Sequence, residues 1–286
     1  MKEFSNATSR KPPADRAIYN RSLLSPSQLD CIDVVLVSPR NPLNIGAVAR
    51  AMANFGFKHL SVVDPYEPHW REARSAVGAP DLLEKAHQTL SLADAVRDCT
   101  LVLGTGTLTH RKPEQPVVRL DELAPFVARE LDRGGRIAVV FGPEKHGLTR
   151  EDLSYCQVLV EIPTDRQQPS MNLGQAAAVC LYELAIRQTP AIPISQSFDA
   201  ESDPASTVGE SNIVMESIPT SGNLETLASL VEQVMVAANY SPKIMQKANQ
   251  HDLRLTLRRL RLSAHDVRRL LGLFRRILRR LQRDPS

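Results

Sequence analysis

The chain has 286 residues, of which 42% are hydrophobic, 23% charged and 5% aromatic, and its formal net charge is +3. These values are typical of a globular protein and exclude a wholly disordered or fibrous one. No run approaches the roughly 18 apolar residues of a membrane-spanning helix, and the polar first residues do not resemble a secretory signal. The four cysteines lie far apart in the chain, which predicts reduced thiols in the cytoplasm and no metal site.

The charge is distributed unevenly along the chain. Residues 190–222 contain five acidic residues and no lysine or arginine, whereas residues 241–286 contain 13 basic and three acidic residues, a net +10. Such a basic end is suited to a polyanion such as nucleic acid, although a solvated helix face has the same pattern. The changes in charge and composition along the chain predict four parts: a flexible arm over 1–28, a body over 29–189, an acidic Pro- and Ser-rich linker over 190–222 and a basic helical extension over 223–286.

The body alternates short apolar runs with helical patterns. Continuous apolar strands separated by helices are typical of a parallel sheet that is covered on both faces. We therefore predict an α/β fold with an open parallel sheet and helices on both faces. The predicted strands span residues 33–37, 60–64, 100–105, 136–142 and 158–162.

Helix signals follow the predicted strands. Residues 47–55 carry apolar side chains at helical spacing, Thr149 and Asp152 match a capping box, and Asn172 precedes an apolar stripe as an N-cap. In the extension, Ser263 and Asp266 match another capping box before a helix with one apolar face and many arginines. An isolated helix of this kind could lie on a membrane, but two preceding helical patterns favour a small module with a basic outer surface.

Three segments at predicted strand ends carry candidate chemistry, because open α/β sheets bind ligands at the carboxyl ends of their strands. The first contains Asn44, Gly46 and Arg50, and its arginine either meets a phosphate or a reacting hydroxyl or is a solvated surface residue. The second contains Gly142 and Glu144. Its glycine either lets a flat ligand approach the main chain or only turns the chain, and its carboxylate can accept hydrogen bonds or orient a base.

The third segment contains Ser170 and Asn172 beside the exposed N–H groups of a helix start, where Asn172 is either a simple cap or a cap with a further role. A fourth segment has Gly104 and Gly106 after a strand, but Thr109 stands where a dinucleotide fingerprint has its third glycine. The basic residues that follow, at 110–112, either bind anions or are solvated.

Together these segments resemble the SPOUT class (the TrmH/SpoU-like group) of RNA 2′-O-ribose methyltransferases. The resemblance rests on N-x-G-x-x-x-R from Asn44 to Arg50, V-F-G-x-E-x-x-G-L over 140–148, and I-P at 162–163 with S-x-N-L over 170–173. The resemblance extends over residues 31–188. The helical, basic extension further resembles the TrmJ branch, which methylates nucleotide 32 in the anticodon loop of tRNA. Met171 and the long N-terminal arm depart from the usual pattern of the family.

The resemblance implies a C-terminal trefoil knot that holds S-adenosylmethionine, and a homodimer with its active site at the subunit interface. Ordinary topology rules argue against a knot, so only the resemblance predicts it. The implied catalytic residues are Asn44, Arg50, Glu144, Ser170 and Asn172. The implied cofactor-binding residues are Leu103, Gly104, Thr105, Gly106, Thr107, Phe141, Gly142, Ile162, Pro169, Ser170, Met171 and Leu173.

The implied reaction is an in-line attack of a ribose 2′-hydroxyl on the cofactor's methyl group, which requires proton removal and alignment but no metal. In related enzymes the counterpart of Arg50 is regarded as the base. A guanidinium rarely loses its proton, so Arg50 can instead hold the adjacent phosphate and polarise the hydroxyl, with Ser170 or the phosphate assisting. The alternatives are methylation of another tRNA or rRNA site, a non-catalytic RNA-binding protein, and a nicotinamide oxidoreductase, for which no glycine fingerprint is found.

Overall fold

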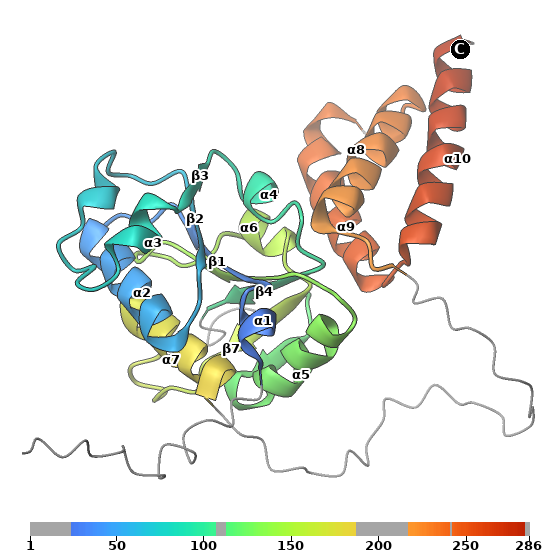
Figure 1. The fold of residues 1–286 in the computed structure, drawn as a ribbon. Coiled ribbons are helices and arrows are strands. Elements are labelled where there is room, and N and C mark those ends of the chain that lie inside the picture. Colours follow the sequence, from blue (N-terminus) through green and yellow to red (C-terminus); the bar gives the residue numbers. More distant parts are fainter. Residues whose placement is uncertain (1–23, 107–112, 187–216, 241, 284–286) are drawn as a thin grey trace, which may run out of the picture.

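The computed structural model describes residues 24–106, 113–186, 217–240 and 242–283 (Figure 1). The strands are β1 (Ile32–Val37), β2 (His59–Val63), β3 (His87–Thr89), β4 (Leu101–Thr105), β5 (Val117–Arg119), β6 (Ile137–Phe141) and β7 (Val158–Glu161). The helices of the body are α1 (Pro26–Leu29), α2 (Pro42–Phe55), the 3-10 helix η2 (Trp70–Glu72), α3 (Pro80–Glu84), α4 (Leu92–Ala95), α5 (Leu120–Asp132), α6 (Arg150–Ser154) and α7 (Leu173–Ile186). The C-terminal part contains α8 (Ser221–Ala237), the 3-10 helix η3 (Lys243–Met245), α9 (Gln246–Arg259) and α10 (Ala264–Arg283).

Within the described residues, the strands form one seven-stranded sheet in the order β3-β2-β1-β6-β4-β7-β5, and each pairing is parallel. The predicted parallel α/β fold and its five strands are confirmed. The strands β3 and β5 are not among the predicted ones; each has three residues with mostly exposed side chains, and they form the two edges of the sheet. Their short length and exposure leave no apolar run to detect.

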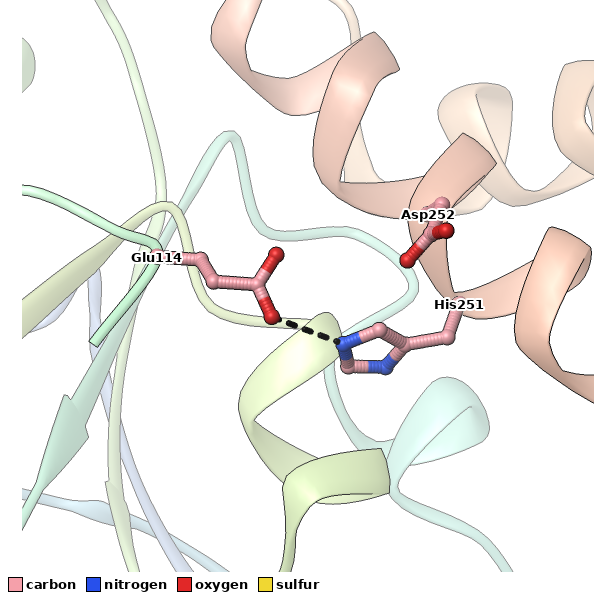
Figure 2. Close-up of side chains that lie close together, drawn as sticks. All are labelled: Glu114, His251 and Asp252. Carbon is pink, nitrogen blue, oxygen red and sulfur yellow. Dashed lines mark ion pairs between the residues drawn. The ribbon is translucent and has the colours of Figure 1, made fainter. Parts of the chain in front are cut away.

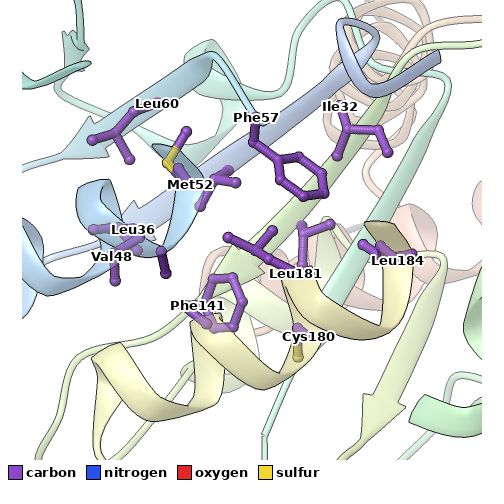
Figure 3. Close-up of a cluster of buried hydrophobic side chains, with 14 of the residues drawn as sticks. Ile32, Leu36, Val48, Met52, Phe57, Leu60, Phe141, Cys180, Leu181 and Leu184 are labelled. Atoms are coloured by element: carbon purple, nitrogen blue, oxygen red, sulfur yellow. The ribbon is translucent and has the colours of Figure 1, made fainter. Parts of the chain in front are cut away.

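Both faces of the sheet are covered, and the side chains of the central strands alternate between two cores. Ile32, Val34 and Leu36 of β1 join the larger core under α2, α5 and α7, whereas Val35 and Val37 join the smaller core near α4 and α6 (Figures 1 and 3). This period of two explains why the strand sequences are apolar throughout: each residue faces a helix layer on one side or the other.

The predicted helix caps are confirmed. Thr149 and Asp152 form a capping box at α6. The Asn172 carboxamide oxygen accepts the Gly174 N–H at 2.9 Å at the start of α7. Ser263 and Asp266 exchange the corresponding bonds before α10. Each helix start was therefore located by its own local polar residues.

The C-terminal helices form a small module with its own apolar cluster, built around Leu227, Leu257 and Val267. The module is docked on the body beside α4 and α6 (Figure 1). The Ser221 N–H donates to the Cys99 carbonyl at 2.7 Å across this junction. α10 packs on α8 through its first half, so its apolar face has a protein partner within the module.

Two predicted part boundaries differ from the structure. Leu24 is 1% exposed in the main core and Ser25 caps α1, so the body begins inside the predicted arm. At the other end, α8 begins at Ser221, inside the predicted linker. Residues 1–23 and 187–216 lie outside the described residues. None of the described helices has the length and hydropathy required to span a membrane.

Candidate active site

Side chains from three distant segments meet at the carboxyl-end edge of the sheet, beyond β1, β6 and β7. Glu144 follows β6, Asn44 lies in the first turn of α2 after β1, and Asn172 precedes α7 after β7. The Asn44 Nδ2 donates to Glu144 Oε1 at 2.8 Å, and the Asn172 Nδ2 donates to Asn44 Oδ1 at 2.9 Å. These three residues, predicted to share one site, are joined in a single chain of hydrogen bonds.

Glu144 is also held by main-chain groups. Its Oε2 accepts the Arg40 N–H at 3.0 Å, and its Oε1 accepts the Asn41 N–H at 3.1 Å. Burial raises the pKa of Glu144, but these bonds and the one from Asn44 outweigh it and keep the pKa below the usual value of the carboxyl group. Glu144 is therefore ionised at neutral pH and a weak base. It fixes the loop after β1 against the loop after β6.

Asn172 uses both ends of its carboxamide. Its Oδ1 accepts the N–H of Gly174 and, at 3.4 Å, that of Gln175, which leaves the Nδ2 for Asn44. Gly174 allows α7 to approach α2 closely, since a Cβ there would lie 2.8 Å from the Ala47 Cβ. Asn172 therefore caps α7 and also binds Asn44, so it is a cap with a further role.

A cavity of about 320 Å³ opens beside this network, at the ends of β4, β6 and β7. Of the residues expected to bind a cofactor, the cavity is lined by Thr105, Gly106, Phe141, Gly142, Ile162, Pro169, Ser170, Met171 and Leu173. Leu103 and Gly104 do not line it, because they lie deeper in β4: Leu103 is fully buried in the core, and Gly104 faces Cys156. Thr107 lies outside the described residues.

The loop from Gly142 to Leu148 forms one wall of the cavity. A Cβ on Gly142 would lie 2.2 Å from the Leu148 backbone nitrogen, so this position admits only glycine. Lys145 and His146 of the same loop also line the cavity. Neither residue was predicted to belong to the site, because both occupy unspecified positions of the V-F-G-x-E-x-x-G-L motif.

Arg50 and Ser170 are the other two expected catalytic residues. Ser170 is exposed and lines the cavity. Arg50 is exposed on α2, and among the described residues it has no hydrogen bond or ion pair to the Glu144–Asn44–Asn172 network. It lies six residues after Asn44, about 9 Å further along the helix and about 240° around it, so it points to a different side of α2.

A second polar cluster joins Glu114 of the body to His251 and Asp252 of α9 (Figure 2). The Arg150 guanidinium lies among them, 3.2 Å from Glu114 and 4.0 Å from Asp252, and its Nε donates to His251 Nε2 at 3.1 Å. The same Glu114 oxygen lies 3.7 Å from His251 Nε2 (Figure 2), so both Arg150 and His251 face this carboxylate. Because this guanidinium already supplies the positive charge, the cluster is a junction between the body and the module.

The chain is similar to several known methyltransferases. A family model described as the SpoU rRNA Methylase family matches residues 32–182, more than half of the chain. The tRNA (cytidine/uridine-2′-O-)-methyltransferase TrmJ of Pectobacterium atrosepticum is 30% identical over 256 residues, which are 89% of this chain and 98% of that protein.

Two further relatives share the likeness. The tRNA (cytidine/uridine/adenosine-2′-O-)-methyltransferase TrmJ of Pseudomonas aeruginosa is 41% identical over 157 residues, which are 54% of this chain and 61% of that protein. A crystal structure of TrmJ from Z. mobilis has a TM-score of 0.71 at 25% identity and covers 86% of this chain and 98% of that chain. The chain therefore belongs to the SpoU rRNA Methylase family and, within it, to the TrmJ branch.

Proposed function

We propose that the chain is an S-adenosylmethionine-dependent tRNA ribose 2′-O-methyltransferase that acts at nucleotide 32 of the anticodon loop. The observation that carries the proposal is the Glu144–Asn44–Asn172 network beside a ligand-sized cavity, in a chain whose relatives are named as tRNA 2′-O-methyltransferases. The finer assignment to nucleotide 32 rests on the resemblance to the TrmJ branch.

The cavity fits the nucleoside part of S-adenosylmethionine. Its volume of about 320 Å³ is in the range of small-molecule sites. Among the described residues, none comes within 4 Å of the Cβ position of Gly106, so they leave the main chain there open to a flat ring. Ile162 and Leu173 provide apolar surface, and Thr105 and Ser170 provide hydroxyl groups. When bound, the cofactor supplies an electrophilic methyl group. We assign its binding to the nine cavity-lining residues named above, together with Thr107 from the resemblance.

The residues of this chain would align and activate the ribose hydroxyl. Glu144 is a poor base, because hydrogen-bond donors already occupy both of its oxygens and its pKa is lowered. We assign it, with Asn44 and Asn172, to holding the loops around the reacting atoms. We assign Arg50 to the phosphate next to the target ribose, where its charge also polarises the hydroxyl, with Ser170 or the phosphate assisting the proton transfer.

A homodimer would complete this site. Arg50 points away from the network of its own protomer, which is consistent with a role in the partner's site. The adjacent surface of α2 and α7 supports such an interface, because it exposes several large apolar side chains. Leu43, Val179, Tyr182 and Ile186 are 54%, 37%, 48% and 42% exposed, respectively.

The basic module would hold the tRNA. Of its basic residues, Arg254 and Arg258 are 7% and 6% exposed, because Arg254 pairs with Glu225 of α8 and Arg258 donates to the Tyr155 carbonyl of the body, so they are not available to RNA. Those of α10 are exposed, including Arg268, Arg275 and Arg279. A groove of about 950 Å³ between the module and the body has further arginines from both sides, at 129, 133, 259 and 261. Such a surface suits phosphates. A cytoplasmic location and the trefoil knot remain predictions.

The test is to incubate tRNA from cells that lack the protein with the purified chain and S-adenosylmethionine, and to map ribose methylation by resistance to alkaline hydrolysis. Methylation at nucleotide 32 is the expected result. Methylation at another tRNA or rRNA nucleotide would contradict the position but not the reaction. Absence of methylation, combined with RNA binding but no affinity for S-adenosylmethionine, would favour a non-catalytic RNA-binding protein.

A further inference from the structure

Tyr66 is an exposed aromatic residue that packing does not explain. It lies in the loop after β2, and 68% of its surface is exposed. The Arg40 guanidinium carbon lies 5.0 Å from the centroid of its ring. The Tyr66 N–H donates to the Pro39 carbonyl at 3.2 Å, so the loops after β1 and β2 are joined at this point.

A second arginine–aromatic pair, Arg71 and Trp70, is held in place by packing and hydrogen bonds within the protein. Trp70 is fully buried, and its Nε1 donates to Gln88 at 3.2 Å. Arg71, over the Trp70 ring, donates to Gln88 and to the Ala86 carbonyl. By contrast, the Arg40 side chain has no carboxylate partner in the part of the chain that the structure describes. Both Arg40 and Tyr66 are exposed to solvent.

The Arg40–Tyr66 pair is fixed to the active site by main-chain bonds. The Arg40 N–H donates to Glu144 Oε2 at 3.0 Å, and Glu144 lines the cavity. Both loops also leave the sheet through a rare backbone conformation: Ser38 and Asp64 each have a φ of 42°. This left-handed conformation is costly for residues other than glycine, and residues that adopt it concentrate at functional sites.

We propose that Tyr66 and Arg40 form a stacking site for one nucleobase of the RNA, next to the reacting ribose. The base stacks on the face of the tyrosine ring that Arg40 does not cover, and the Arg40 guanidinium, which lies over the other face, can meet the adjacent phosphate. Aromatic rings and guanidinium planes are the groups that bind unstacked bases of single-stranded RNA loops. The inference rests on the proposed function, and it names the residues that hold the target loop in a splayed conformation.

The test compares the affinity of the full chain for an anticodon-loop RNA hairpin with its affinity for hairpins that carry one abasic nucleotide in turn. Stacking on one aromatic side chain predicts that Tyr66→Ala raises the Kd about ten-fold, while Tyr66→Phe stays near the wild-type value. The loss should disappear on a hairpin that lacks the stacked base, because no stacking remains to be removed. Leu90→Ala, which deletes a side chain 87% exposed on a neighbouring loop, is the matched control.

The inference is overturned if Tyr66→Ala binds the intact hairpin as the wild type does, or if its loss persists unchanged at every abasic position. Calorimetry with S-adenosylmethionine should give the wild-type affinity for Tyr66→Ala, and a reduced affinity would assign Tyr66 to the cofactor pocket instead. Failure of the proposed function has a separate signature, which is a wild-type chain that does not methylate tRNA. The binding comparison still decides the stacking site in that case, because it does not depend on turnover.

Discussion

Replacing Asn44 by aspartate would set a second carboxylate against Glu144. The Asn44 Nδ2 now donates to Glu144 Oε1 at 2.8 Å, and in Asn44→Asp an oxygen would take its place. Two unit charges at 2.8 Å repel by about 1.5 kcal/mol in water and by about 6 kcal/mol at an effective dielectric constant of ~20. Because Glu144 is exposed, we expect the lower part of this range, a loss of about 2 kcal/mol in the free energy of unfolding at neutral pH.

The loss should depend on pH in a defined direction. Repulsion raises the pKa of the carboxyl pair in the folded variant, so the penalty grows as the pH rises through the unfolded values near 4 and is largely absent in acid. The wild type behaves in the opposite way. Because the pKa of Glu144 is lowered in the folded state, its ionised form stabilises the fold at pH values above the usual pKa of a carboxyl group, and this contribution is lost as the pH falls.

Urea denaturation at about pH 4 and about pH 8 measures the difference. The matched control is Asn223→Asp, which adds the same charge at a capping position in α8, remote from Glu144. An Asn44→Asp chain as stable as the control at both pH values would show that the network does not link the loops. The same variant should also lose turnover, because the loops it separates surround the reacting atoms.

Three further substitutions test the site and the junction. Gly142→Ala should abolish S-adenosylmethionine binding in calorimetry, because its Cβ would lie 2.2 Å from the Leu148 nitrogen, while the circular dichroism spectrum stays unchanged. Wild-type affinity in this variant would show that the loop does not form a wall of the cofactor site. Arg258→Ala should lower the free energy of unfolding by about 2–4 kcal/mol, because it removes a buried side chain that donates to the Tyr155 carbonyl. Chemical denaturation measures this loss, and a change under about 0.5 kcal/mol would contradict the docked junction. Arg50→Ala should keep cofactor affinity but lose methyl transfer by about 100-fold or more in a tRNA methylation assay, and full activity would refute its role.

Local signals explain which parts of the fold could be predicted. The five central strands are apolar throughout because both of their faces are covered, and the caps at Thr149, Asn172 and Ser263 act on N–H groups within a few residues. The edge strands, the burial of Leu24 and the start of α8 at Ser221 depend on contacts with remote elements. No local pattern encodes such contacts.

The same division holds for the site. Motif positions identified Glu144, Asn44 and Asn172, but not their order in the network or the main-chain donors that hold Glu144. The exposed Tyr66 lies in no motif and was not singled out. It became visible once the structure gave its exposure and its contact with Arg40.

By itself, the sequence determined that this protein has a doubly covered parallel sheet, three polar loops at strand ends and a basic helical end. Only the tertiary structure decided that β6 lies between β1 and β4, which brings Glu144 within 2.8 Å of Asn44 although 100 residues separate them. It also decided which arginines of the basic end are buried against the body. Sheet order and domain docking are chosen by the burial of surfaces far apart in the chain, and a linear pattern does not record which surfaces will meet.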